Sequence, residues 1–419
     1  MGLELELFIK YFNLTACILF TVCYSYQMLY IPISFLMKRK RFTATRVCRY
    51  GVVIAARNEE NVIGHLIDSL QKQDYDSSMI DVFVIADNCT DETARVAREA
   101  GATVFEREDK TLVGKAYALD FAFKAILESG EAYDGYFIFD ADNLVTPSFV
   151  KEMNAVFTNG YPVVAGYRNT KNYSDSMTAA CSGLYFLKEC RFLNNSRMLL
   201  RSGCGVNGTG FLIAHNIIAE AGGWNWFLLT EDVQFTVECA LKGIKIGYAH
   251  DAIFYDEQPQ TFAQSWRQRL RWVKGGYQVL ATYGFRLLRK MFRSFYCFDI
   301  LMNLMPIVCI NLLVFFVNGS VFLYGMLTVK HNPTLGATTL LSLLETLRGA
   351  LLTLTVVGGV TLIAEWKRIV APWHSKLLSF FVFPFFVLTY MPLSIVALFA
   401  RVKWKPIHHA KSITIRDLE

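Results

Sequence analysis

Four stretches of this 419-residue chain are long and apolar enough to cross a lipid bilayer, and they constrain its fold more than any other feature. They cover residues 13–37, 301–328, 339–364 and 377–400. The first is too long for a signal peptide and lacks a small-residue cleavage site. Residues 50–280 alternate charged and apolar runs, as water-soluble domains do. The sequence therefore predicts a soluble domain held between membrane segments.

Basic residues predict how these segments are oriented. The run at 38–41 follows the first stretch directly, which by the positive-inside rule places the central domain in the cytosol and the acidic start of the chain outside. Three further crossings would leave the tail outside, although it carries Arg401, Lys403, Lys405 and Lys411. Either one C-terminal segment does not cross, or the charge rule is broken here.

Charged residues also interrupt the apolar pattern. Glu345 and Arg348 lie inside the stretch 339–364, where each charge is costly unless it has a partner or lines a water-filled or polymer path. Since they are three residues apart, they share a helix face and can pair with each other. Aromatic and basic residues mix in segment 285–300, as is typical of an amphipathic helix that lies in the membrane interface.

Composition excludes several classes of function. The net charge of +6 is explained by lysines and arginines beside the membrane, and no motif of a nucleic-acid-binding protein is present. The ten cysteines form no C-x-x-C pair and no zinc-type spacing with histidine, so we expect reduced, mostly buried thiols. No G-x-G-x-x-G follows the first predicted strand, which argues against a nicotinamide or flavin cofactor.

Short β-branched runs alternate with helical patterns in the central region. We expect a strand followed by a loop in 50–60, and further strands in 81–86, 102–105 and 135–139. We expect helices ending near residue 71, beginning after Thr90 or Asp91, and covering 114–128. This alternation predicts a doubly wound α/β sheet, whose ligands bind beyond the carboxyl ends of its strands. Asn58, Asp87 and Asp140 fall at such ends.

Seven short motifs occur along the central region in the order ARNEE, ADNCTDET, GKAYAL, DAD, NGTGF, TED and QRLRW. This series, over residues 50–280, resembles the family 2 glycosyltransferases, in particular the membrane branch with chitin-, hyaluronan-, cellulose- and poly-N-acetylglucosamine-type synthases. The resemblance implies a nucleotide-sugar-binding glycosyltransferase A-type domain, a doubly wound mixed sheet with flanking transmembrane helices. The corresponding division is an N-terminal span in 1–40, a cytosolic domain in 41–284, an interfacial helix in 285–300 and a membrane region of about three spans with a basic tail in 301–419.

Asp140 and Asp142 form a D-x-D pair at a predicted strand end. Residues i and i+2 of a strand point to the same side, so both carboxylates could hold a hard divalent cation against a diphosphate. The resemblance implies that Asp140 contacts the nucleotide and that Asp142 ligates Mg²⁺ or Mn²⁺. The alternative for an isolated D-x-D is a solvated acidic turn.

The resemblance implies that three further residues bind the nucleotide. Asp87 would contact uridine, and Arg57 and Glu59 would shape the base and ribose pocket. The family often has two adjacent acids at this strand end, whereas Ala86 precedes Asp87 here, and a helix cap is the alternative role for Asp87. Lys115, at a predicted helix start, would add positive charge near the diphosphate or would be a solvated helix lysine.

An inverting transfer needs a base that takes the proton of the acceptor hydroxyl. Asp232 of the TED motif matches the family base, with Glu231 as the fallback because spacing cannot distinguish adjacent carboxylates. Thr230 or Asp232 could also cap the following helix.

The acceptor end is implied by two other motifs. Gly208 and Thr209 belong to a glycine-dense segment whose backbone can approach a ligand closely. Gln268, Arg271 and Trp272 match Q-x-x-R-W and share one face of a predicted helix. A tryptophan plane can stack a sugar ring, and a guanidinium can bind a diphosphate in a bidentate manner.

Taken together, the motifs predict a multi-pass enzyme of the cell membrane that adds sugar from a UDP-sugar, UDP-N-acetylglucosamine or UDP-glucose, to a growing polysaccharide. The alternative is transfer of a single sugar to a ceramide- or diacylglycerol-like lipid, and a third hypothesis is a non-catalytic membrane scaffold. One span before the domain and three after it are few for a polymer channel, so an accessory membrane subunit or a homo-oligomer is a further expectation.

Overall fold

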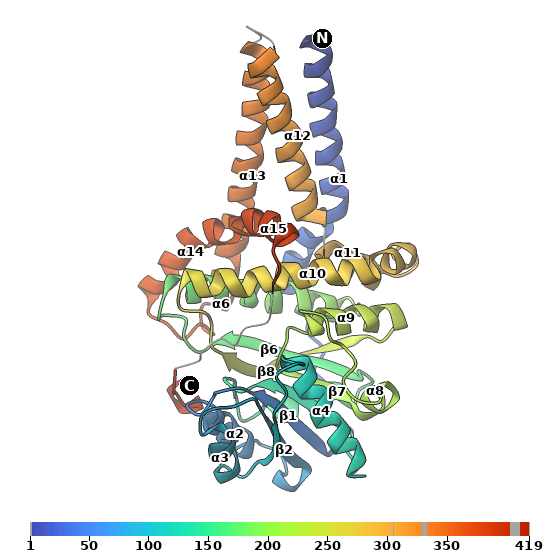
Figure 1. Ribbon diagram of the computed structural model, residues 1–419, viewed down its shortest axis with the longest axis vertical. Helices are drawn as coiled ribbons and strands as arrows, with labels where there is room; N and C mark the ends of the chain where they lie inside the picture. The colour runs from blue at the N-terminus through green and yellow to red at the C-terminus, as the bar shows by residue number, and fades with distance from the viewer. Residues whose placement is uncertain (1, 305, 329–332, 403–410, 419) are drawn as a thin grey trace.

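The computed structural model describes residues 2–304, 306–328, 333–402 and 411–418, and it consists of an α/β domain below a group of long apolar helices (Figure 1). The domain is built on one eight-stranded mixed sheet. Its strands are β1 (Tyr50–Ala56), β2 (Ile80–Asp87), β3 (Thr103–Arg107), β4 (Gly135–Asp140), β5 (Leu144–Val145), β6 (Val163–Thr170), β7 (Phe211–Ala214) and β8 (Ile246–Asp256).

The order of strands in the sheet is β3-β2-β1-β4-β7-β6-β8-β5. β1 pairs in parallel with β2 and β4, so their carboxyl ends meet at one edge. β7 runs antiparallel to both β4 and β6, and it joins this parallel half to the parallel pair β6 and β8. The expectation of a doubly wound mixed sheet is confirmed.

Helices cover both faces of the sheet. Buried residues of α2 (Ile63–Gln71), α3 (Thr93–Glu99) and α5 (Phe149–Phe157) pack on one face. The other face packs against α4 (Lys115–Glu128), α6 (Met177–Lys188), α8 (His215–Ala221) and α9 (Glu231–Lys242). β1 is buried along almost its whole length, which explains why its sequence is a continuous apolar run without alternation. The strands and helices expected in 50–139 are present within one or two residues.

Three helices extend together beyond the domain: α1 (Gly2–Leu36), α12 (Pro306–Thr328) and α13 (Pro333–Glu365) (Figure 1). Among the described residues, helical stretches long and apolar enough to cross a membrane are Glu4–Leu36, Thr339–Glu365 and Trp373–Phe399. α12 is also apolar and has 23 residues, which at 1.5 Å per residue matches a hydrocarbon core of about 30 Å.

The lower part of α1 belongs to the domain rather than to a free span. The hydroxyl groups of Tyr26 and Tyr30 donate to the two carboxylate oxygens of Asp299, at 2.8 and 2.9 Å. Asp299 is fully buried and also pairs with Arg197 of α7 (Asn195–Leu199). The helix therefore begins before the predicted stretch 13–37, and its last turns are held by polar contacts with the domain.

The last apolar stretch, predicted as one span over 377–400, is two helices, α14 (Trp373–Leu388) and α15 (Tyr390–Phe399). They lie across the base of the three long helices, and α14 packs on α6 while α15 packs on α10 (Phe262–Lys290) (Figure 1). Arg269 of α10 donates to the carbonyl of Phe386 and to the hydroxyl of Thr389 at the break, at 3.2 and 2.6 Å. A buried guanidinium thus fixes the junction between the two helices.

The segment 285–300 is divided as well. α10 continues to Lys290, and α11 (Phe295–Leu304) begins after a short turn, so the predicted interfacial helix is the end of one helix and the start of another.

The described tail residues 411–418 return to the domain. Ile415 and Leu418 are buried against Leu144 and Tyr255, at the edge of the sheet formed by β5 and β8. Of the basic tail residues, Lys403 and Lys405 lie outside the described residues. The tail and the domain therefore lie on the same side of the long helices.

Candidate active site

A cavity of about 340 Å³ lies at the carboxyl ends of the central strands, where α6 and α10 cover the sheet. Every predicted site residue except Thr209 lines it: Arg57, Glu59, Asp87, Lys115, Asp140, Asp142, Gly208, Glu231, Asp232, Gln268, Arg271 and Trp272. Motifs spread over more than 200 residues of sequence are therefore brought to one site, as the strand-end argument predicts.

Asp87 ends β2 at one side of the cavity and is only 4% exposed. Burial raises its carboxyl pKa, while the guanidinium of Arg107, 2.6 Å away, acts in the opposite direction. Asn88, with φ of 53°, donates its side-chain amide to the same carboxylate at 2.9 Å. Asp87 makes no helix cap, because Asp91 accepts the Thr93 backbone N–H. Arg107, which the sequence did not single out, therefore holds this carboxylate in place.

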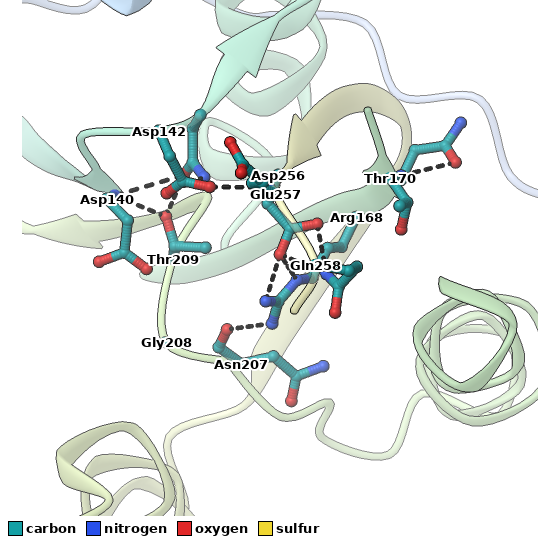
Figure 2. Close-up of polar contacts among 12 residues, drawn as sticks. Asp140, Asp142, Arg168, Thr170, Asn207, Gly208, Thr209, Asp256, Glu257 and Gln258 are labelled. Carbon is teal, nitrogen blue, oxygen red and sulfur yellow. Dashed lines mark hydrogen bonds and ion pairs between the residues drawn. The ribbon is translucent and has the colours of Figure 1, made fainter. Parts of the chain in front are cut away.

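β4 ends at Asp140, and Asp142 lies in the turn that follows. Strand alternation therefore does not apply to this pair, and the turn brings both side chains to the cavity. Asp142 is 5% exposed and accepts the backbone N–H of Glu257 at 2.7 Å (Figure 2). Asp140 donates its backbone N–H to the hydroxyl of Thr209 at 2.9 Å. Thr209 thus lies behind the D-x-D turn and supports it.

The residues present fit a divalent cation that arrives with a diphosphate. Among the described residues, no group of three or more His, Cys, Asp or Glu side chains is placed to enclose a metal. Asp140 and Asp142 supply carboxylate oxygens at the cavity wall. Mg²⁺ is typically held by one or two carboxylates, with substrate phosphates and water as the other ligands. Two carboxylates are therefore sufficient for a cation bound together with the donor.

Lys115 begins α4 and lines the cavity. Its ammonium pairs with Asp140 and donates to the carbonyl of Gly208 at 2.7 Å. The helix N-terminus adds a further positive potential at this point. A diphosphate placed here would meet an ammonium group and a helix N-terminus, and the alternative of a solvated helix lysine does not fit these contacts.

Glu231 and Asp232 form the first turn of α9. Burial, followed by the charge of Asp232, raises the pKa of Glu231 to about 7. Burial also raises the pKa of Asp232, while Arg271 and Lys115 act against that shift. Thr230 occupies the N-cap position but makes no side-chain capping bond among the described residues. The carboxylates thus face a poorly solvated cavity whose cations favour their charged forms.

Gln268, Arg271 and Trp272 line the cavity from α10, which lies on the side of the domain nearer the long helices α1, α12 and α13 (Figure 1). The Trp272 ring packs edge to face on Phe186 of α6, with centroids 5.8 Å apart. Arg271 donates to the carbonyl of Leu229, just before the TED motif, at 3.3 Å. Gly208 also lines this region, in a left-handed conformation with φ of 78°. The acceptor end predicted from sequence is therefore next to the two carboxylates of α9.

Several lining residues were missed by sequence reasoning. Arg168 of β6 donates to Asp256 and to the carbonyl of Asn207 (Figure 2). Its guanidinium carbon lies 3.6 Å from the centroid of the Phe186 ring. Asp256 ends β8 and Glu257 follows it, so the strand-end rule that found Asp140 could have found them. Arg168 lies inside a strand, and nothing in the local sequence indicates that it faces the cavity.

A sequence model described as "Glycosyltransferase like family 2" matches residues 48–275, which is more than half of the chain. The chain belongs to this family. All seven motifs lie within the matched residues, and the cavity contains side chains from the beginning and the end of the match. The resemblance stated from the motifs is confirmed.

Similar curated proteins have names that refer to different products. The chain is 28% identical over 283 residues to the probable glycosyltransferase YdaM of Bacillus subtilis, over 60% of this chain and 61% of that protein. It is 26% identical over 241 residues to the β-monoglucosyldiacylglycerol synthase of Synechocystis, over 55% and 48% respectively. It is 24% identical over 237 residues to the poly-β-1,6-N-acetyl-D-glucosamine synthase of Staphylococcus aureus, over 54% of each. The matches span between about half and three fifths of these relatives.

One similar solved structure extends the likeness in fold beyond the family 2 match. The mannosyltransferase PcManGT of Pyrobaculum calidifontis, solved with GDP-mannose and Mn²⁺, superposes with a TM-score of 0.54 over 93% of this chain and 99% of that one. The sequence identity is 15%, so this similarity establishes the fold alone.

Proposed function

We propose that the protein transfers a hexosyl group, with inversion, from a UDP-sugar to an acceptor that reaches the cavity from the membrane side. The observation that carries this proposal is the meeting of three groups in one cavity: the D-x-D carboxylates, the carboxylates of α9 and the Q-x-x-R-W side chains of α10. The donor would lie along β1, β2 and β4, with uridine near Asp87, Arg57 and Glu59.

Asp142 and Asp140 would hold Mg²⁺ or Mn²⁺, and the bound cation neutralises charge on the diphosphate. Lys115 is placed to exchange its partner Asp140 for a phosphate oxygen of the donor. Arg271 lines the same cavity and can hydrogen-bond the departing UDP. These groups stabilise the negative charge that develops as the bond between the anomeric carbon and the phosphate oxygen breaks.

Asp232 is the proposed base. It takes the proton of the acceptor hydroxyl while that oxygen attacks the anomeric carbon from the side opposite UDP. Arg271 and Lys115 act against the effect of burial on the pKa of Asp232 and so favour the ionised carboxylate. Trp272 and Phe186 provide aromatic surfaces on which an acceptor sugar can stack.

For the acceptor, we propose a growing polysaccharide, supported by the similarity to poly-N-acetylglucosamine synthases. A single membrane lipid is the second candidate, because one observation favours it. α1, α12 and α13 are joined at their centre by hydrogen bonds from Asn13 to Asn318 and Ser342, at 3.0 and 2.7 Å. These contacts join the three helices directly to one another, so we expect a polymer path to need a further subunit. The similarity to glucosyldiacylglycerol synthases agrees with a lipid acceptor.

We also propose a multi-pass protein of the cell membrane with a cytosolic domain. α1, α12 and α13 would cross, and α14 and α15 would lie at the interface. The basic run at 38–41 would then face the cytosol, where the UDP-sugar is found.

The test is UDP release by the purified, reconstituted full chain with UDP-glucose, UDP-N-acetylglucosamine or UDP-glucuronate and Mg²⁺ or Mn²⁺, with Asp232→Asn as the control. Release with one donor that is lost in the variant supports transferase activity, and a long product supports a polysaccharide acceptor. A product with one lipid-linked sugar would select the lipid acceptor. Absence of release with every donor and added lipid would contradict the proposal and favour a non-catalytic scaffold.

A further inference from the structure

An ion pair is exposed on α13, far from the catalytic cavity. The guanidinium of Arg348 lies 2.6 Å from the carboxylate of Glu345, and their side chains are 77% and 59% exposed. Within the described residues, neither side chain forms an ion pair with any other group. Both lie inside the candidate span Thr339–Glu365.

The position of this pair along α13 makes its exposure costly. Gly358 and Gly359 pack against Phe383 and Phe380 of α14, which lies across the base of the long helices. At 1.5 Å per residue, Glu345 is about 20 Å further along α13, inside a hydrocarbon core about 30 Å thick. Charged side chains at this depth face protein or a water-filled cavity rather than lipid.

The pair forms part of a regular stripe. Leu341, Glu345, Arg348 and Leu352 follow the spacing of four, three and four residues that forms a seam between two parallel helices. Leu341 and Leu352 are 59% and 65% exposed, so the whole stripe lies on the outer side of the three-helix group. Ser342, which hydrogen-bonds to Asn13 of α1, lies outside this seam.

We propose that this stripe is the interface through which a second copy of the chain binds in the membrane. A twofold axis along the membrane normal brings two parallel α13 helices together at the stripe. Arg348 has five N–H donors, so each guanidinium can pair with its own Glu345 and with that of the second copy. The four charges then form an alternating ring with no net charge, shielded from lipid by the leucines above and below. Self-complementarity of the stripe favours a second copy over a different subunit.

This proposal rests on α13 crossing the membrane and does not depend on the reaction catalysed. It is tested by the mass of the full chain in lipid nanodiscs. We expect wild-type protein at twice the chain mass of 47.7 kDa. The Glu345→Leu/Arg348→Leu variant should appear at the mass of one chain, because it keeps an apolar helix but loses the ring. The Glu345→Arg/Arg348→Glu exchange should remain a dimer, since the alternation of charge is preserved.

Disulfide formation in native membranes provides the second measurement, in a Cys17→Ser background because Cys17 is exposed on α1. Leu352→Cys lies in the seam and should cross-link two chains. Ala350→Cys, two residues away and therefore on the opposite side of the helix, should not. Any of four results would overturn the proposal: a wild-type monomer, equal cross-linking at both positions, a leucine variant that still dimerises, or a smaller subunit bound in place of the second copy.

Discussion

Glu231 and Asp232 are adjacent on α9, yet replacement of each should have a different effect. Asp232→Asn removes the proposed base, and we expect kcat to fall by about 10²–10⁴-fold with little change in the KM for the donor. Glu231→Gln should cost less than about tenfold, because it leaves that base in place. Steady-state UDP release measures both. The reverse order of effects would identify Glu231 as the base.

The pH dependence of the same two variants gives an independent check. A base is active when unprotonated, so activity is lost as pH falls through its pKa, and burial raises that pKa for Asp232. Because the pKa of Glu231 is raised to about 7, Glu231 is largely protonated in the acidic range where Asp232 titrates, and glutamine mimics this neutral form. We therefore expect the acid limb of kcat/KM to keep its position in Glu231→Gln. A shift of the acid limb would contradict the assignment.

The ion pair of Arg107 with Asp87 is buried, with side chains 7% and 6% exposed. Arg107→Met leaves a buried carboxylate without its cation, which typically costs about 3–5 kcal/mol of unfolding free energy. We expect a marked fall in thermal stability of the full chain in detergent, together with weaker UDP binding. Arg95→Met is the matched control, because its ion pairs are exposed and contribute about 0–1 kcal/mol. Equal effects of the two substitutions would contradict this role for Arg107.

At the scale of single elements, the end of α10 and the turn that follows it combine exposed aromatic and basic side chains. Phe285 and Phe292 are 64% and 80% exposed, and Arg286, Arg289 and Arg293 lie between or next to them. This composition is typical of a helix that lies in the interface of an anionic membrane, where each cation contributes about 1 kcal/mol.

Because α10 also carries Gln268, Arg271 and Trp272, we expect lipid charge to influence catalysis. Wild-type protein should release UDP about two- to tenfold faster in nanodiscs with phosphatidylglycerol than with phosphatidylcholine alone. This factor is smaller than the one expected if the whole attraction between the arginines and the lipid acted on catalysis. Arg286→Gln/Arg289→Gln/Arg293→Gln should remove the difference between the lipids. Arg95→Gln/Arg98→Gln, on α3 of the soluble domain, should retain it.

The elements that were predicted well are those whose signal is local. The strands β1, β2 and β4 are apolar runs that end in polar residues, so both the strands and their site residues Asp87 and Asp140 could be read from sequence. The break between α14 and α15 could not, because hydropathy does not register the contact of Arg269, more than 100 residues away, with Phe386 and Thr389. Arg168 was missed for the same reason, since its place in the site depends on Asp256 of another strand.

At the scale of the whole molecule, α10 connects the two parts of the protein. One side of this 29-residue helix lines the catalytic cavity, and Arg269 and Lys274 bond to the backbone of α14 and α15. Under the proposed function, an acceptor in the membrane would pass this helix and reach Trp272 before the carboxylates of α9. We therefore expect the acceptor side of the site, rather than the donor side, to face the membrane.

The number of crossings decides on which side of the membrane the tail lies. If α1, α12 and α13 cross while α14 and α15 do not, the domain and the tail share one side, as the packing of Ile415 and Leu418 on the domain requires. The basic tail then obeys the positive-inside rule, which four crossings would break.

Labelling of single cysteines by a membrane-impermeant maleimide tests this topology. Arg416→Cys in the tail and Ser129→Cys in the domain, both at exposed positions, should react only after the cells are permeabilised. Glu4→Cys, at the far end of α1, should react in intact cells. If Arg416→Cys reacts in intact cells and Ser129→Cys does not, a fourth crossing is required. Only passage of α14 and α15 through the bilayer could separate the tail from the domain.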